Sequence, residues 1–224
     1  MGVCRKIGDD HYRASVLKGL GEVLLARGDL IGAQKKHEEA LAITNQLGEK
    51  GASAEIRVAL AQLAIEGGRP AVAEAPARDA AEEFRQEKAT DSEVSAHIVL
   101  ARSLLAQGKC PAAQEAIDGA KALLNKSENL DTHFSFRITA ARVRQASGRP
   151  SDRLEAAKSL EAVLGEAKKT GFLGQELEAG LALGEIELQS GNIVRARRRL
   201  EALEKQAAAQ GFGLIVRKAA AARK

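Results

Sequence analysis

Apolar residues recur three and four positions apart along most of this chain, with polar residues between them, which is the pattern of amphipathic α-helices. Each apolar stretch ends at a glycine, and a second stretch begins after it. The turn glycines are Gly28, Gly68, Gly108, Gly148 and Gly191. Their steps of 40, 40, 40 and 43 residues give the period of a repeat array. We therefore predict an all-α chain, an α-solenoid of about five antiparallel helical hairpins.

The turn glycines also set the limits of the predicted elements. We expect an N-terminal tail at residues 1–8, a repeat domain at residues 9–210, and a capping helix with a basic tail at residues 211–224. The hairpins are predicted at about 9–48, 51–88, 91–127, 130–170 and 173–210. Pro76 lies within a predicted helix and should bend it or delay its start. Three residues inserted near Ser151 account for the step of 43.

Small residues occupy fixed places relative to each turn glycine. Seven positions before it stand Gly21, Ala61, Ala101, Ala141 and Gly184, each preceded by an apolar residue. Five and twelve positions after it stand Ala33, Ala40, Ala73, Ala80, Ala113, Ala120, Ala196 and Leu203. Small side chains let two helices approach closely, so we expect these positions to form the packing face of each hairpin.

These residues resemble the tetratricopeptide repeat family, whose repeats combine Leu-Gly or Leu-Ala, a turn of the Gly-Asp or Gly-Arg-Pro kind, and two spaced alanines. The best match contains Leu17, Leu20, Gly21, Leu24, Gly28, Asp29, Ala33, Ala40 and Leu41. The likeness extends from about Tyr12 to Gln210. The period exceeds the usual one of about 34 residues and is similar to that of bacterial regulators and kinesin light chains. The resemblance implies stacked hairpins whose first helices line a concave surface that binds partners.

Polar residues recur six and thirteen positions before each turn glycine and should form a ridge on that concave surface. The candidate groove residues are Ser15, Lys18, Glu22, Glu55, Gln62, Ser95, Arg102, Ser135, Arg142, Glu178 and Glu185. Lys18 is included because it matches the first of two carboxylate-binding positions in chaperone-binding members of the family, although Glu22 replaces the second. Polar side chains in register suit an extended or helical peptide. We expect Arg102 and Arg142 to bind a carboxylate.

The charge of the chain is uneven. Residues 1–140 hold 18 Lys and Arg against 20 Asp and Glu, whereas residues 141–224 hold 16 against 10. The basic residues that stand out are Arg195, Arg197, Arg198, Arg199, Arg217 and Lys218. A nucleic-acid-associated repeat protein that uses this basic third is therefore the alternative function. Aromatic residues for base stacking are missing around the cluster, and acidic residues follow it, which favours a solvated helix face over a nucleic-acid partner.

Residues suited to catalysis or metal binding do not gather in the sequence. The four histidines, His11, His37, His97 and His133, fall in different hairpins without a partner at ligand spacing. Cys4 and Cys110 lack the spacing of a disulfide framework and are expected to be reduced thiols. We therefore predict no enzyme activity, no metal and no cofactor. Since no secretory signal or membrane-spanning run is evident, we expect a cytoplasmic protein without a membrane partner.

The predicted architecture, more than any single residue, indicates the function. We expect a non-enzymatic interaction scaffold that binds a protein or peptide partner in its concave groove. The repeats also resemble the C-terminal arrays of bacterial serine/threonine kinases and of winged-helix or adenylate-cyclase-type regulators. This second resemblance implies the regulatory or sensor portion of a bacterial signalling protein, with a fused or associated kinase or DNA-binding regulator domain.

Overall fold

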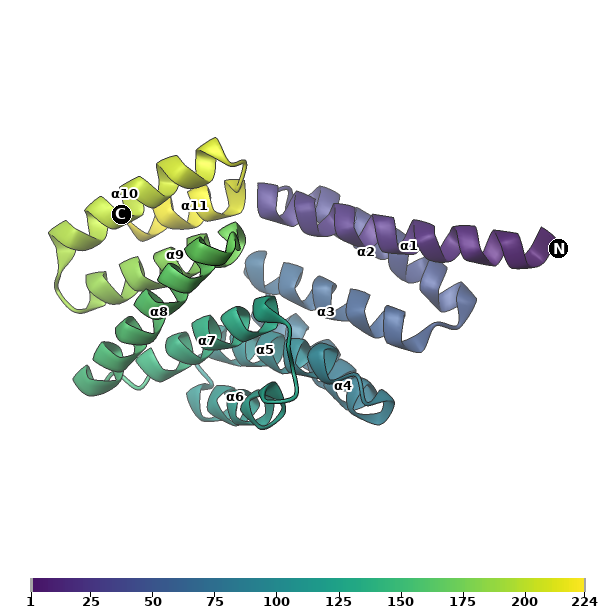
Figure 1. Cartoon of the computed structure of the whole chain (residues 1–224), viewed down its shortest axis with the longest axis horizontal. Coiled ribbons are helices and arrows are strands. Elements are labelled where there is room, and N and C mark those ends of the chain that lie inside the picture. The colour runs from purple at the N-terminus through teal and green to yellow at the C-terminus, as the bar shows by residue number, and fades with distance from the viewer. Residues whose placement is uncertain (1, 224) are drawn as a thin grey trace.

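The computed structural model describes the backbone of residues 2–223 and the side chains of residues 9–223. Over residues 2–223 the backbone forms eleven α-helices without a strand. They are α1 (Gly2–Arg27), α2 (Leu30–Leu47), α3 (Lys50–Glu66), α4 (Pro70–Glu87), α5 (Thr90–Ala106), α6 (Cys110–Leu124), α7 (Leu130–Gln145), α8 (Pro150–Thr170), α9 (Leu173–Gln189), α10 (Ile193–Ala209) and α11 (Gly213–Ala222). Consecutive helices pair as five antiparallel hairpins, and α11 follows the last of them (Figure 1). The predicted all-α solenoid is confirmed.

The hairpins stack in chain order, and the array curves until its end returns to its beginning (Figure 1). Helix α11 contacts α1 as well as α9 and α10. Leu214 of α11 joins Leu25 of α1 and Leu63 of α3 in one apolar cluster. The ammonium nitrogen of Lys218 lies 2.8 Å from a carboxylate oxygen of Glu66. The capping helix therefore covers the last hairpin and also joins it to the first two.

A backbone requirement explains why glycine recurs at the turns. At Gly28 the φ angle is 85°, and the backbone N–H donates to the carbonyl of Leu25 at 2.8 Å. This left-handed conformation is strained for residues that carry a side chain, so glycine is favoured. The next helix then begins with a cap, because the Asp29 carboxylate accepts a hydrogen bond of 2.8 Å from the N–H of Gly32. The turn glycines thus recur at a regular interval because each one ends the first helix of a hairpin.

The small residues counted from the turn glycines form the interior of the hairpins. Ala33, Ala40, Ala73, Ala80, Ala113, Ala120 and Ala196 have no exposed surface, and Leu203 is buried. The three inserted residues lengthen α8 to 21 residues and leave Leu160 and Val163 in the core. These packing predictions are confirmed. Leu20 is an exception, because 42% of it is exposed whereas Leu100 and Leu183 at the same place in later hairpins are buried.

One predicted boundary is wrong, and one of the two outcomes expected at Pro76 does not occur. Residues 2–8, expected to be a tail, belong to α1, which begins at Gly2. Helix α4 begins at Pro70, where the missing N–H of proline costs no helical hydrogen bond, and it continues through Pro76. The delayed start considered for this helix does not occur, and the bend at Pro76 stays a prediction. Burial of Ala77 next to Pro76 shows that packing against the neighbouring helices holds this segment helical.

Two histidines occupy interior positions of the hairpins. His37 of α2 is fully buried, its ring lies against Gly21 of α1, and neither ring nitrogen has a hydrogen-bond partner among the described residues. The ring of His97 in α5 packs in the same way against Gly119 of α6. Burial lowers the pKa of both imidazoles, and the charge of Lys18 lowers the pKa of His37 further. Both rings are therefore packing groups that the fold keeps neutral.

These two pKa shifts predict a loss of stability in mild acid. The unfolded chain takes up a proton on each ring near the ordinary pKa of 6.5, whereas the folded rings stay neutral to a lower pH. The contribution of these rings to the free energy of unfolding is therefore complete above pH 6.5 and declines as the pH falls below it. Urea unfolding over a pH series should show this decline, and His37→Leu should make it shallower. An equally steep decline in the variant would contradict the assignment.

Candidate functional site

A cavity of about 890 Å³ lies on the concave side of the array. Its walls come mainly from the first helices of the hairpins, α1, α3, α5, α7 and α9, and α11 completes them. Apolar side chains such as Val58, Ile98 and Ile138 lie between polar ones on these walls. Cavities that hold organic ligands in proteins measure about 300 to 1,000 Å³. This cavity is therefore large enough for several residues of a peptide.

The structure brings most of the predicted groove residues together. The cavity is lined by Lys18, Glu22, Glu55, Gln62, Ser95, Arg102, Ser135, Arg142 and Glu178. Ser15 and Glu185, the other two, are not among the lining residues. Ser15 is an exposed residue of α1, and Glu185 pairs with Arg142 at 2.5 Å. The positions counted from the turn glycines thus identify the face of each first helix that lines the cavity.

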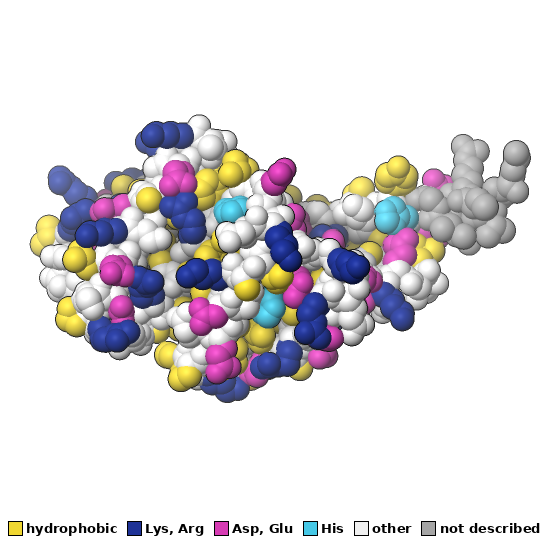
Figure 2. All heavy atoms as spheres, turned by 60° about the horizontal axis from the view of Figure 1, so that its bottom comes forward, with side chains coloured by type: hydrophobic (Ala, Val, Ile, Leu, Met, Phe, Trp, Pro, Cys, Tyr) yellow, Lys and Arg dark blue, Asp and Glu magenta, His cyan; other side chains and the backbone are white. Residues whose placement is uncertain are grey.

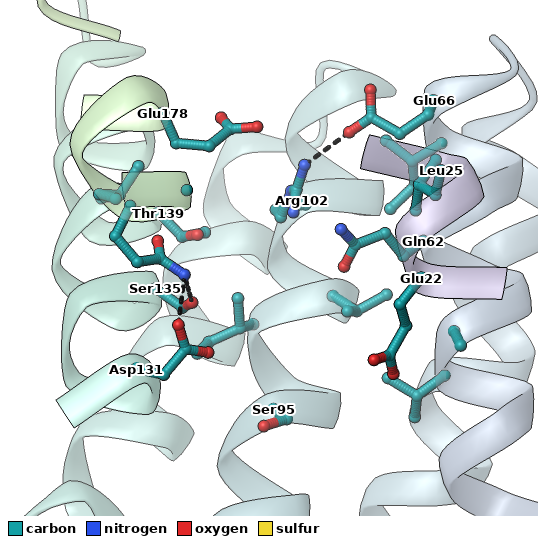
Figure 3. A pocket seen from close by; sticks show the side chains of 18 of the residues that line it. Glu22, Leu25, Gln62, Glu66, Ser95, Arg102, Asp131, Ser135, Thr139 and Glu178 are labelled. Atoms are coloured by element: carbon teal, nitrogen blue, oxygen red, sulfur yellow. Dashed lines mark hydrogen bonds and ion pairs between the residues drawn. The ribbon is translucent and has the colours of Figure 1, made fainter. Parts of the chain in front are cut away.

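Ion pairs within the protein occupy the cationic groups of the cavity. Arg102 donates to Glu66 at 2.7 Å (Figure 3), and Lys218 approaches the same carboxylate at 2.8 Å. Lys18 likewise pairs with Glu55 at 2.5 Å. The expectation that Arg102 binds the carboxylate of a partner is not met in this geometry, because the buried side chain of Glu66 already neutralises it. The same holds for Arg142, because its guanidinium already pairs with the carboxylate of Glu185.

Glu178 is the second carboxylate of this charged end of the cavity. Lys218 lies 3.7 Å from it and Arg142 lies 3.9 Å from it. Burial alone would raise the pKa of the Glu178 carboxyl, but the positive charges of Lys218, Arg102 and Arg142 together hold it below its ordinary value. Glu178 therefore remains ionised, and Glu66, Glu178 and Glu185 together balance the three cations Arg102, Arg142 and Lys218.

The opposite end of the cavity is acidic. Glu22 and Asp91 have no ion pair among the described residues, and Asp131 accepts only a hydrogen bond of 2.8 Å from Gln175. In Figure 3 the carboxylates of Glu22 and Asp131 come from opposite walls and point toward the space between them, with Ser95 nearby. Unpaired carboxylates in a concave, low-dielectric site attract positive charge. This end of the cavity is suited to a cationic group.

Sequence reasoning missed several lining residues. They include Glu66, Asp91, Asp131, Gln175 and Lys218. A signal was present for two of them, because Asp91 and Asp131 each stand seventeen positions before a turn glycine. No local signal marked Lys218, which reaches the cavity only because the array curves back on itself.

The predicted basic cluster is dispersed in the structure. Arg195 and Arg199 of α10 both pair with the buried Glu187, at 2.9 and 3.0 Å. Lys218 points into the cavity, where Glu66 neutralises it. Arg197, Arg198 and Arg217 are exposed. On the face shown in Figure 2, positive and negative side chains are interspersed. The six residues therefore do not form one cationic surface of the kind that phosphates require.

The described residues offer little for other chemistry. Among residues 9–223, His, Cys, Asp and Glu do not gather in groups of three or more that could hold a metal ion. Cys110 is a free, half-buried thiol, and the side chain of Cys4 lies outside the described part. Within residues 2–223, each helix is too short or too polar to cross a membrane.

Three solved structures share the fold of this chain. A Rap protein, in its crystal structure complexed with competence and sporulation factor, matches with a TM-score of 0.73 at 15% identity, over 91% of this chain and 55% of that chain. The TPR-like repeats of a putative kinesin light chain from Podosopora anserina match with a TM-score of 0.55 at 20% identity, over 89% and 97%. Yeast Tom70 matches with a TM-score of 0.53 at 19% identity, over 97% and 41%.

The chain spans little more than half of the Rap protein and less than half of Tom70. No curated protein matches its sequence significantly. At the level of families, residues 12–86 match the model described as tetratricopeptide repeat, which covers most of the first two hairpins. Residues 12–86 are thus similar to tetratricopeptide repeats, and the array as a whole shares the fold of the three solved structures.

Proposed function

We propose that the chain is a non-enzymatic interaction scaffold that binds a peptide in the cavity between its first helices. The observation that carries this proposal is the cavity itself, whose walls present polar side chains in register from all five hairpins. An extended peptide offers backbone hydrogen-bond groups at regular intervals, which suits a ladder of polar side chains. Ser95 and Ser135, one repeat apart on neighbouring walls, provide hydroxyl groups for such contacts.

The charges of the cavity define the kind of peptide. Lys18, Arg102, Arg142 and Lys218 each pair with a carboxylate of the protein, and Arg102 and Lys218 share that of Glu66. Glu22, Asp91 and Asp131 form no ion pair among the described residues. The ligand that best balances these charges carries a lysine, an arginine or a free amino terminus, placed between Glu22 and Asp131.

The likeness to the Rap protein supports a proposal for the wider role. The Rap protein of the matching structure is complexed with competence and sporulation factor, and its fold resembles this chain over 91% of the present residues. We extend the proposal to a cytoplasmic regulatory or sensor module of a bacterial signalling protein, in which peptide binding controls a fused or associated kinase or DNA-binding domain.

Peptide selection tests the site. A phage-displayed library of random peptides is enriched on the immobilised wild-type chain, on Gln62→Trp, and on Gln114→Trp as the matched control. Gln62 lines the cavity, whereas Gln114 is exposed on α6 outside it. We expect peptides rich in Lys and Arg from the wild type and the control, and a loss of affinity of about tenfold or more with Gln62→Trp, because the indole occupies part of the space that the peptide needs.

Two outcomes would contradict the proposal. One is the absence of any enriched peptide on the wild-type chain. The other is that the enriched peptides bind Gln62→Trp and wild type equally, which would place the binding surface elsewhere. Circular dichroism of both variants confirms that the helices are retained.

A further inference from the structure

Each first helix has one face that packs on the hairpin before it. This stacking face consists of the residues twelve, eight and five positions before the turn glycine. In α9 these are Ala179, Leu183 and Ile186, which share a core cluster with residues of α7 and α8. Leu177 and Leu181 of the same helix instead join the core of their own hairpin. The stacking face is therefore the surface by which a hairpin joins its predecessor.

The other hairpins follow the same rule. Phe136 and Val143 of α7 belong to the cluster formed by α3 to α6. Ala96 of α5 packs with residues of α3 and α4, and Leu63 of α3 packs with residues of α1 and α2. Each of the four consecutive interfaces thus uses residues from these three positions.

In α1 the stacking face is apolar but exposed. Its residues are Val16, Leu20 and Val23, which are 68%, 42% and 54% exposed, and Tyr12 extends the row at 74%. The counterparts of Val16, Leu20 and Val23 in later hairpins are buried, or half-buried at Leu60 and Ala140. Helices α1 and α2 form an edge of the array (Figure 1), and no described residue covers this face. A solenoid end in water needs a polar outer face, so a covered state is favoured.

We propose that a second copy of this chain covers the stacking face of α1, with the two α1 helices antiparallel about a two-fold axis. Asp9 and Arg27 are exposed at the two ends of the row and have no ion pair among the described residues. Eighteen residues separate them, which is five helical turns, so they share the face of Tyr12 and Val16. An antiparallel partner sets Asp9 of each copy against Arg27 of the other, and Val16 against Leu20. Such a contact is self-complementary and closes as a dimer.

Sedimentation equilibrium over a range of concentrations tests the dimer. We expect twice the mass of the chain at high concentration, and Val16→Glu should raise the dimer dissociation constant about tenfold or more, because it places a charge in the apolar row. Val194→Glu is the matched control, since Val194 is 85% exposed on α10, away from α1. This control should dimerise like the wild type.

A charge exchange tests the antiparallel geometry. Asp9→Arg alone should weaken the dimer, because it sets two arginines against each other, and adding Arg27→Asp should restore it. A monomer at every concentration would overturn the proposal and leave the face to a different helical partner. A dimer that Val16→Glu does not weaken, or one that the charge exchange does not restore, would overturn it as well. None of these results bears on the peptide cavity, which lies on another face of α1.

Discussion

Gly213→Ala should detach α11 from α1 and open the array. A β-carbon at Gly213 would overlap the backbone carbonyl of Arg27, and no side-chain rotation relieves a clash with backbone. Helix α11 must therefore move, which draws Leu214 out of the cluster with Leu25 and separates Lys218 from Glu66. Overpacking of this kind costs about 1 to 3 kcal/mol. Hydrogen exchange should show faster exchange in α11 and at the C-terminal end of α1.

Gly165→Ala is the matched control for this prediction. It adds the same methyl group within α8, where no atom lies within 4 Å of the added β-carbon. Since alanine favours the helix, Gly165→Ala should raise the stability by about 0.5 to 1 kcal/mol. Small-angle scattering should show an increased radius of gyration for Gly213→Ala only. Unchanged exchange in α11 of Gly213→Ala would contradict the closure of the array.

Gly21→Ala should destabilise the first hairpin. The added β-carbon would lie 2.5 Å from Cε1, 2.7 Å from Nδ1 and 2.8 Å from Nε2 of His37. The ring is rigid and has no exposed surface, so it has no space into which to move. We expect the free energy of unfolding to fall by about 1 to 3 kcal/mol, measured by urea unfolding.

Gly19→Ala, two residues earlier in the same helix, separates this clash from the effect of helix propensity. Nothing lies within 4 Å of its added β-carbon, so it should stabilise the chain slightly. Combining Gly21→Ala with His37→Ala should remove the clash. The double variant should therefore lose less free energy of unfolding than the sum of the losses in the two single variants. Equal effects of Gly19→Ala and Gly21→Ala would show that the ring does not constrain this position.

The fold was predictable because its determinants are local and repeated. Gly28 and its counterparts specify the turns through their left-handed backbone, and residues such as Ala33 and Ala73 specify the close helix packing. Five repetitions of one pattern make the period evident even where single residues deviate. The helical start at Gly2 was not predicted. The delayed start considered for α4 does not occur, because packing around the buried Ala77 holds the segment near Pro76 helical.

The candidate site was predictable only in part. Counting from the turn glycines placed Gln62, Ser95 and Ser135 on the cavity wall, since one face of each first helix repeats. The ion pairs escaped prediction because they join residues far apart in sequence. Lys218 meets Glu66 across 152 positions, and this contact depends on the curvature that accumulates over five hairpins. Which charged side chains of the cavity remain unpaired for a ligand therefore depends on the closure of the whole array.

The most direct test of the cavity as the binding site is photo-crosslinking of a library-selected peptide. The photoreactive amino acid benzoylphenylalanine replaces Gln62 on the cavity wall in one protein, and Gln114 outside the cavity in another. We expect a covalent adduct from position 62, competed by unlabelled peptide, and none from position 114. An adduct from position 114 alone, with binding affinity retained, would contradict this expectation.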